Sequence, residues 1–355
     1  MFYGHLKYRN IIKYKNQFIH LKNANDLAKL LKFPAYKINL LTLNPPYDIF
    51  EIRKEKGFRL IEAPKEPLMK ILKILKNYLQ SVYYFNKTDA AYGFILHTKN
   101  DKITRNIVTN ANFHLHSKYM LNIDLKDFFH QIKYRHIDDI FRSKPFYFDD
   151  KLINFLARIT LFNCRLPMGS PTSPVLSNLA MIPVDLELLH FAKSESLKYT
   201  RFVDDLTFSS DRFISAKIFE KIQSILSSYK LIINYEKIKT YSEDDIKVVT
   251  VLELRKKVSI PQEFFKDLDE DIIRFKNSIE LNAKYNENYN NKLLNKTEQI
   301  INGKINFIAL VYGENSKEFN YYYSNFVQAQ NSYESIESIN WLDIPYQFIY
   351  LWNLF

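Results

Sequence analysis

The stretch of sequence that decides the fold is RFVDDLTF, residues 201–208. Its two adjacent carboxylates, Asp204 and Asp205, stand between two apolar runs, which is typical of a tight turn between buried strands. The chain has three other Asp pairs, at residues 138–139, 149–150 and 244–245. None of these pairs has apolar runs on both sides, so we expect them in solvated turns or helix caps. The pair at 204–205 is therefore predicted to lie at the tip of a β-hairpin.

Two further blocks precede this pair along the chain. In LNIDLKDFF, residues 121–129, Asp124 follows an apolar run that predicts a strand, and LPMGSPTSP, residues 166–174, is a turn rich in Gly, Pro and Ser. Neighbouring strands can bring Asp124 to the Asp204–Asp205 turn. Magnesium prefers oxygen ligands, and two metal ions about 3.5–4 Å apart need a carboxylate that contacts both. The three blocks therefore predict a two-metal site for phosphoryl transfer.

The order and wording of these blocks resemble those of reverse transcriptases, and among them the retron type of bacteria. Residues 110–114, NANFH, match a further signature of retron enzymes, and the resemblance extends over about residues 45–262. It implies an α+β fold of the right-hand polymerase type, whose palm combines an antiparallel sheet with helices. The expected domains are fingers at about 1–115, a palm at 116–260 with a fingers-side insertion near 140–170, and a helical thumb at 261–355.

The activity implied by this resemblance is RNA-directed DNA synthesis from dNTPs, with two Mg²⁺ ions as cofactors and Mn²⁺ as an alternative ion. Asp124, Asp204 and Asp205 would be the catalytic, metal-binding carboxylates, and Leu125 would join them as a metal ligand. A retron enzyme would copy a structured non-coding RNA, start from a 2′-OH in that RNA and make a branched RNA–cDNA product. The resemblance also implies a role in anti-phage defence with an effector protein as partner.

A strand-turn-strand pattern at residues 47–64 resembles the fingertip hairpin that closes over the incoming nucleotide in this family. A cation beside such a turn can clamp phosphates. Arg59 is the best match to the family's triphosphate-binding cation, and Lys54 is a weaker match. The alternative for both residues is an ordinary solvated charge.

Phe129 lies five residues after Asp124, at the position where the family carries a ring that excludes a ribose 2′-OH. Alternation along a strand would turn only one of Phe128 and Phe129 toward the site. We therefore expect Phe129 to be the steric gate and Phe128 to be a core ring. A core position for Phe129 is the alternative.

Three more residues complete the expected nucleotide site. Met168 and Gly169 would lie under the nucleotide, where Gly allows close backbone approach; the family usually has Gln at the position of Met168. Lys237, in the run NYEKIKT at 234–240, would protonate the leaving pyrophosphate. A charge at a strand edge is the alternative for Lys237.

Two groups of residues are expected to contact RNA. Asn110 and His114 come from the NANFH signature, with a structural role as the alternative for His114, and no Cys/His partners are spaced for zinc. Aromatic rings that stack on bases contribute about 1–3 kcal/mol per base. The rings proposed for this are Tyr321, Tyr322 and Tyr323. Helical spacing would place at least some of these rings in the core.

The net charge is unevenly distributed. Residues 261–355 hold 8 Lys/Arg and 13 Asp/Glu, a balance of −5, so residues 1–260 carry +16 and the whole chain +11. A basic body suits a polyanionic partner. The sequence has no run of eighteen apolar residues, its N-terminus lacks a signal-peptide core, and its single cysteine, Cys164, excludes an internal disulfide. We therefore expect a cytoplasmic protein that does not associate with a membrane.

Two other functions stay open. The chain has Val251 where retron enzymes carry Gly, so another bacterial defence-type or group II intron-derived reverse transcriptase is an alternative within the family. A catalytically silent RNA-binding scaffold is the alternative from another class. The presence of all three carboxylates argues against the scaffold.

Overall fold

The structure is a computed structural model of the chain, and it describes residues 7–53, 57–285 and 291–331. These residues form two compact units. The first unit takes its residues from 1–52 and 58–250, and the second takes its residues from 53–57 and 251–355. One hydrophobic core in the first unit runs from Phe18 to Ile233. This core crosses the predicted fingers–palm boundary near residue 115.

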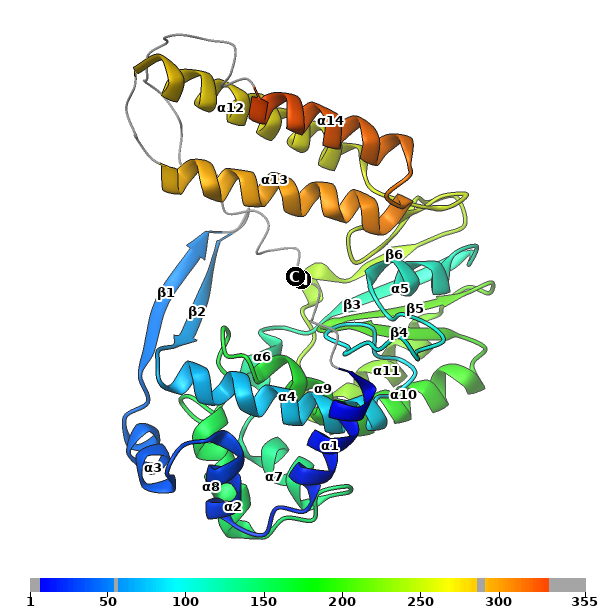
Figure 1. Cartoon of the computed structure of the whole chain (residues 1–355). Coiled ribbons are helices and arrows are strands. Elements are labelled where there is room, and N and C mark those ends of the chain that lie inside the picture. Colours follow the sequence, from blue (N-terminus) through cyan, green and yellow to red (C-terminus); the bar gives the residue numbers. More distant parts are fainter. Residues whose placement is uncertain (1–6, 54–56, 286–290, 332–355) are drawn as a thin grey trace. The chain divides into compact units, whose positions relative to one another are not determined.

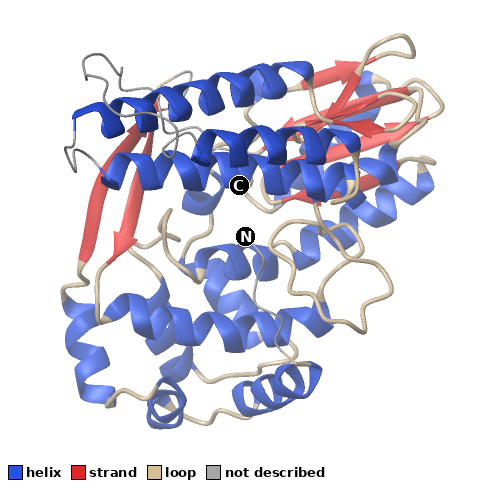
Figure 2. Cartoon of the chain, turned by 45° about the horizontal axis from the view of Figure 1, so that its top comes forward, coloured by secondary structure: helices blue, strands red, loops and turns tan. Residues whose placement is uncertain are grey.

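The first unit begins with helices and a two-stranded ribbon. In chain order these elements are α1 (Tyr8–Ile19), α2 (Ala24–Leu31), α3 (Ala35–Leu43), β1 (Tyr47–Arg53), β2 (Phe58–Pro64), α4 (Leu68–Asn86) and α5 (Ile107–His114). Figure 2 shows β1 and β2 as a ribbon apart from the larger sheet. Their bounds confirm the two strands predicted at residues 47–64, and residues 54–56 between them lie outside the described residues. The long helix α4 buries Ile71, Leu75 and Val82, whose spacing places them on one face.

Further along the chain, short helices alternate with strands, of which β3 to β6 form a larger sheet and β7 does not belong to it. These elements are β3 (Tyr119–Asp124), α6 (Phe128–Gln131), α7 (Tyr134–Arg142), α8 (Asp150–Thr160), α9 (Ser173–Ala180), α10 (Ile182–Ser194), β4 (Lys198–Phe202), β5 (Asp205–Ser210), α11 (Ala216–Ser228), the 3₁₀ turn η1 (Tyr235–Lys237), β6 (Lys239–Tyr241) and β7 (Lys247–Val249). Helix α8 packs against α2 and α3. Figure 1 follows this order by colour.

The central sheet has the strand order β4-β5-β3-β6, and β5 pairs antiparallel with both β4 and β3. Successive side chains of a strand point to opposite faces. Tyr199 and Arg201 of β4 reach Asp185 on α10, whereas Thr200 between them reaches His114 on α5. Helices α10 and α5 therefore cover opposite faces of the sheet. Both faces of the sheet are therefore covered at β4.

The second unit is a small strand pair followed by three helices. Its elements are β8 (Leu252–Leu254), β9 (Val258–Ser259), α12 (Gln262–Tyr285), α13 (Asn291–Tyr312) and α14 (Lys317–Asn331). The three helices pack on one another (Figure 1). A buried ion pair, in which Lys304 Nζ lies 2.6 Å from Asp271 Oδ2, joins α13 to α12. The architecture as a whole is mixed α+β with antiparallel sheets, as predicted.

The three other Asp pairs, at residues 138–139, 149–150 and 244–245, lie in different kinds of local structure. Asp149 caps α8 by accepting a hydrogen bond from the Leu152 N–H at 2.8 Å, and residues 244–245 lie in a turn, as predicted. The expectation was wrong for Asp138, which lies inside α7 and forms an ion pair with Arg142 at 2.7 Å. An Asp placed four residues before an Arg suits a helix surface.

Among the described residues, no single helix has the length and apolar character needed to cross a membrane. Only α9 and α10 taken together, bent by 48° at their junction, meet that test.

Candidate active site

Strand β3 and the β4–β5 turn bring the three predicted carboxylates to one edge of the central sheet. Asp124 ends β3 and stands in register opposite Asp205, which begins β5. Asp204 lies in the turn just before Asp205, and its carbonyl oxygen accepts a hydrogen bond from the Leu125 N–H at 3.1 Å. Asp124 is buried, and Asp204 and Asp205 are half-buried. The predicted hairpin tip and its neighbour on β3 are both confirmed.

The segment after β5 and α11 supplies polar partners to Asp124. The Lys237 ammonium lies 3.0 Å from Asp124 Oδ2, and the Asn234 side-chain amide donates to Asp124 Oδ1 at 3.1 Å. The Asn234 backbone N–H donates to the Asp124 carbonyl at 2.8 Å. Lys237 was predicted to belong to the site, and the structure places it on the first carboxylate. Asn234 was missed, although it opens the same NYEKIKT run.

The electrostatics of this edge are those of crowded negative charges. Burial, and then the charges of Asp204 and Asp124, raise the pKa of Asp205 to about 7. Burial and the charge of Asp124 also raise the pKa of Asp204, although Lys237 and Arg59 act in the opposite direction. A carboxyl group surrounded by like charges resists ionisation until a cation arrives.

The donor set suits a divalent metal ion that a nucleotide helps to hold. Carboxylate oxygens are hard ligands, and Mg²⁺ is typically bound through one or two carboxylates together with substrate phosphates and water. Among the described residues, no three His, Cys, Asp or Glu side chains form a ready-made metal cage. Asp124, Asp204 and Asp205 therefore fit an ion whose coordination is completed by phosphate oxygens. The Leu125 side chain lies in the core, so only its backbone could contribute.

One of the two predicted phosphate-binding cations, Arg59, lies on the β1–β2 ribbon. Arg59 is on β2 and is half-buried. Its positive charge partly opposes the rise in the pKa of Asp204 that burial and Asp124 cause, so its guanidinium acts on the carboxylate edge. Lys54 lies outside the described residues.

The structure corrects the reasoning about the steric gate. Phe128 and Phe129 lie on the short helix α6, not on a strand, because Asp127 adopts a left-handed conformation with φ of 45° and ends the extended chain. The two rings still differ as expected, since Phe128 is 2 % exposed and Phe129 is half-buried. Helix α6, rather than strand alternation, separates the core ring from the ring nearer the surface.

Met168 and Gly169 contact strand β2. The Glu62 N–H donates to the Met168 carbonyl at 2.7 Å. Gly169 has φ of +130°, and a Cβ atom there would lie 2.9 Å from the Glu62 carbonyl oxygen. The close approach that requires glycine is thus to the β2 backbone. The Glu62 carboxylate is itself buried against Arg165 at 2.9 Å and His130 at 3.2 Å, an ion cluster that the sequence did not indicate.

The residues expected to contact RNA near 110–114 are interior. His114 is fully buried, and its two ring nitrogens form hydrogen bonds of 2.7 Å with the hydroxyls of Ser209 and Thr200. Burial lowers the pKa of His114 to about 3, so the ring is neutral. Asn110 is 1 % exposed. Neither side chain has surface to offer to RNA, so both are corrected to structural residues.

The three consecutive tyrosines of α14 have different environments. Tyr322 is buried, and its hydroxyl donates to Asp269 Oδ2 at 3.3 Å. Tyr321 is 57 % exposed and Tyr323 is 50 % exposed. The Tyr323 ring stacks on Phe319 with centroids 5.5 Å apart. Only Tyr321 and Tyr323 therefore present a ring to the surface.

Comparison with known proteins gives one clear similarity. A family model described as reverse transcriptase (RNA-dependent DNA polymerase) matches residues 52–278. The chain is 29 % identical to the retron Ec86 reverse transcriptase of Escherichia coli over 274 residues, covering 74 % of this chain and 81 % of that protein. It is 27 % identical to the Escherichia coli retron Ec83 reverse transcriptase over 245 residues, covering 65 % and 76 %. Among solved structures, the telomerase of Candida albicans matches with a TM-score of 0.41 and 13 % identity, covering 82 % of this chain and 61 % of that one.

Proposed function

We propose that this chain, which belongs to the reverse transcriptase family and is related to retron reverse transcriptases, copies a structured non-coding RNA into DNA at the carboxylate edge of its central sheet. The observation that carries the proposal is the register of β3 and β5, which sets Asp124 opposite Asp205 beside the Asp204 turn. In this proposal the first unit supplies the fingers and palm of a right-hand polymerase. The second unit supplies the thumb.

In the reaction, a hydroxyl oxygen of the primer attacks the α-phosphorus of a dNTP. The new O–P bond forms as the bond to the bridging oxygen of pyrophosphate breaks, and the hydroxyl proton leaves to solvent or a base. Asp124, Asp204 and Asp205 would hold two divalent ions, which when bound would neutralise phosphate charge and lower the pKa of the attacking hydroxyl.

Two cations of this chain would act on the phosphates. Arg59 would bind the triphosphate, because a guanidinium matches phosphate oxygens in charge and geometry. Lys237 now neutralises Asp124 at 3.0 Å. Its side chain is 57 % exposed, so it is free to turn from the carboxylate to the leaving pyrophosphate and donate a proton there.

The retron type is the finer part of the proposal. The relatives named above are retron enzymes, and the charge of +16 on residues 1–260 suits an RNA partner. A retron enzyme would prime from a 2′-OH within its own RNA and leave a branched RNA–cDNA product. It would serve anti-phage defence together with an effector protein.

The proposal is tested by sequencing the nucleic acid that copurifies with the protein. A single structured RNA joined to complementary DNA through a branch would support the retron type. Extension of a DNA primer on an unrelated RNA, with no branched species in the cell, would support another bacterial reverse transcriptase. RNA binding without any dNTP incorporation in Mg²⁺ or Mn²⁺ would indicate the silent scaffold.

The predicted stacking of RNA bases on the thumb is tested at its two exposed rings, Tyr321 and Tyr323. We expect the double variant Tyr321→Ala/Tyr323→Ala to bind its cognate RNA hairpin at least about thirtyfold more weakly, at roughly 2 kcal/mol or more, because it loses two stacking faces. Tyr322 stays in place because its ring is buried. Competition binding against a scrambled RNA measures the change. Equal discrimination by the variant and the wild type would place the specific contacts elsewhere.

A further inference from the structure

The turn that presents Asp204 and Asp205 contains a strained residue. Val203 has φ of 63°, in the left-handed region that β-branched side chains rarely occupy. Such conformations persist only where the surrounding structure holds them, and they concentrate at functional sites. Val203 directly precedes Asp204, so whatever holds Val203 also sets the direction of the two carboxylates.

Two groups lie close against Val203. Arg201 donates a hydrogen bond from Nη1 to the Val203 carbonyl at 3.0 Å. Gly93 lies against the Val203 side chain and nitrogen, since a Cβ atom at residue 93 would stand 2.7 Å from Val203 Cγ2 and 2.9 Å from the Val203 nitrogen. Any side chain at residue 93 would therefore push against the turn.

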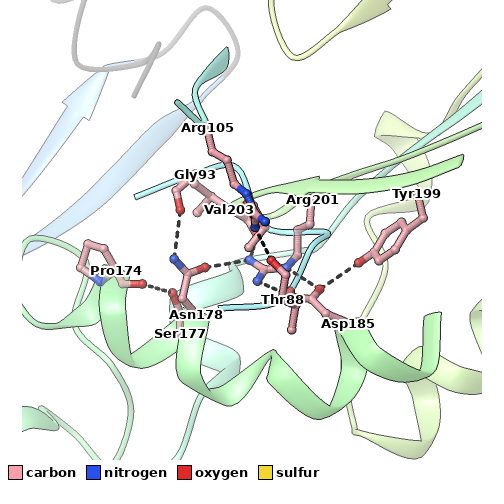
Figure 3. A network of polar contacts seen from close by, with 11 residues as sticks. Thr88, Gly93, Arg105, Pro174, Ser177, Asn178, Asp185, Tyr199, Arg201 and Val203 are labelled. Atoms are coloured by element: carbon pink, nitrogen blue, oxygen red, sulfur yellow. Dashed lines mark hydrogen bonds and ion pairs between the residues drawn. The ribbon is translucent and has the colours of Figure 1, made fainter. Parts of the chain in front are cut away.

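Arg201 is itself fixed by a buried network (Figure 3). Its Nε and Nη2 donate to the two oxygens of Asp185, both at 2.8 Å, and neither side chain has any exposed surface. Its Nη1 donates to Asn178 Oδ1 at 3.0 Å, and the Asn178 amide donates to the Gly93 carbonyl at 3.0 Å. The contacts close a ring from Arg201 through Asn178 and Gly93 to Val203.

The outer members of the network do not contact the turn. The Tyr199 hydroxyl donates to Asp185 Oδ1 at 3.0 Å, and the Thr88 hydroxyl donates to Asp185 Oδ2 at 2.9 Å. Both side chains are buried. They complete the hydrogen bonding of the Asp185 carboxylate, which a buried charge requires.

We propose that Arg201, Asn178 and Gly93 are positioning residues that hold the Val203 turn in its left-handed form, so that Asp204 and Asp205 face the metal ions and nucleotide. The inference rests on the proposed function, since it assigns these carboxylates to metal binding. A network that served only the stability of the core would show no difference between its inner members and its outer ones. That difference is what the experiment measures.

The matched pair of variants is Asn178→Ala and Tyr199→Phe. Each removes one buried polar group from the same network, but only Asn178 belongs to the ring around Val203. The measurements on the full chain are the melting temperature, kcat and KM for dNTP on an RNA template, and Mn²⁺ binding by electron paramagnetic resonance. Mn²⁺ binding reports on the carboxylates without any polymerisation.

We expect Asn178→Ala to lower kcat at least tenfold and to weaken Mn²⁺ binding at least fivefold, with KM changed less than threefold. Tyr199→Phe should leave kcat and Mn²⁺ affinity within twofold, with a fall in melting temperature similar to that of Asn178→Ala. Equal effects of the two variants on kcat and on Mn²⁺ binding would overturn the inference. If the wild type does not polymerise, the proposed function fails, and Mn²⁺ binding by the two variants still decides the positioning role.

A second pair decides the question if Asn178→Ala does not fold. Gly93→Ala should lower kcat and Mn²⁺ affinity by crowding the turn. Adding Val203→Gly removes the Cγ2 atom and supplies a residue that accepts positive φ. We expect the double variant to regain at least threefold of the lost kcat and Mn²⁺ affinity. A Gly93→Ala protein with wild-type values, or a double variant with no recovery, would contradict the proposal.

Discussion

The interior and the edge of the central sheet treat charged and polar groups in opposite ways. In the interior, Asp185 has a bidentate arginine and two hydroxyl donors, all buried. At the edge, the Lys237 ammonium lies 3.0 Å from Asp124, while burial and the charges of Asp204 and Asp124 raise the pKa of Asp205 to about 7. The interior is complete without any ligand, whereas the edge carries more negative charge than its own cations offset. That deficit marks the edge as the place where a ligand brings positive charge.

The largest effect is expected from removing the carboxylates at the edge. We expect the variant Asp204→Asn/Asp205→Asn to lose dNTP incorporation by about a thousandfold or more, equivalent to roughly 4 kcal/mol of transition-state stabilisation, because metal ligands are removed. Its metal-free fold should be at least as stable as the wild type, since repulsion among the three neighbouring carboxylates is relieved. Primer extension and urea denaturation measure the two quantities. Undiminished synthesis would remove the assignment of these residues.

The next largest effect is expected from removing the buried Arg201–Asp185 ion pair in the interior. We expect Arg201→Met to lower the free energy of unfolding by about 3–5 kcal/mol, because it leaves the Asp185 charge buried without its partner. The double variant Arg201→Met/Asp185→Leu should recover part of this loss, because no unpaired charge remains. Urea denaturation of the three proteins provides the comparison. A loss below about 1 kcal/mol in the single variant would show that water reaches Asp185, against its complete burial.

The residues at the carboxylate edge could largely be predicted from the sequence. The apolar runs around residues 201–208 indicated a hairpin, and local order along the chain was enough to place Asp204 and Asp205 at its tip. Lys237 was predicted by its place in a short run of residues. These features depend on local pattern, which a sequence shows directly.

The interior could not be predicted in the same way. Asp185 lies on helix α10 and Arg201 lies on strand β4. The ion pair between them depends on how α10 packs on β4. The sequence left His114 open between an RNA contact and a structural role, because a sequence does not show which face of α5 is covered. Gly169 was predicted to allow close approach of the nucleotide, and the neighbour that the structure shows is the backbone of Glu62 on strand β2, far earlier in the chain. Such contacts depend on tertiary packing, not on local pattern.

A pH titration sharpens the description of the interior on the other face of β4. Burial lowers the pKa of His114 to about 3 from an ordinary 6.5. Below pH 6.5 the unfolded chain therefore takes up a proton that the folded chain does not, and stability is lost as pH falls toward 3. We expect His114 to account for a loss of about 2 kcal/mol between pH 7 and pH 5.

The measurement is urea denaturation of wild type and His114→Gln at several pH values. The slope of unfolding free energy against pH should be shallower in His114→Gln. Parallel curves for the two proteins would mean that the His114 ring accepts a proton within the fold.

The smallest expected effect compares two adjacent rings. One is near the carboxylate edge and the other is in the interior. Phe129 is half-buried on α6, and Phe128 is in the core. If Phe129 closes the space beside the deoxyribose, Phe129→Ala should raise the ratio of rNTP to dNTP incorporation about tenfold, or roughly 1.4 kcal/mol, with a modest loss of stability. Phe128→Ala should instead lower stability by about 3–5 kcal/mol with no gain in ribonucleotide use. Single-nucleotide incorporation kinetics on an RNA template give the ratio, and thermal unfolding gives the stability. An unchanged ratio in an active Phe129→Ala protein would assign that ring to packing, and the edge would then select its sugar through another residue.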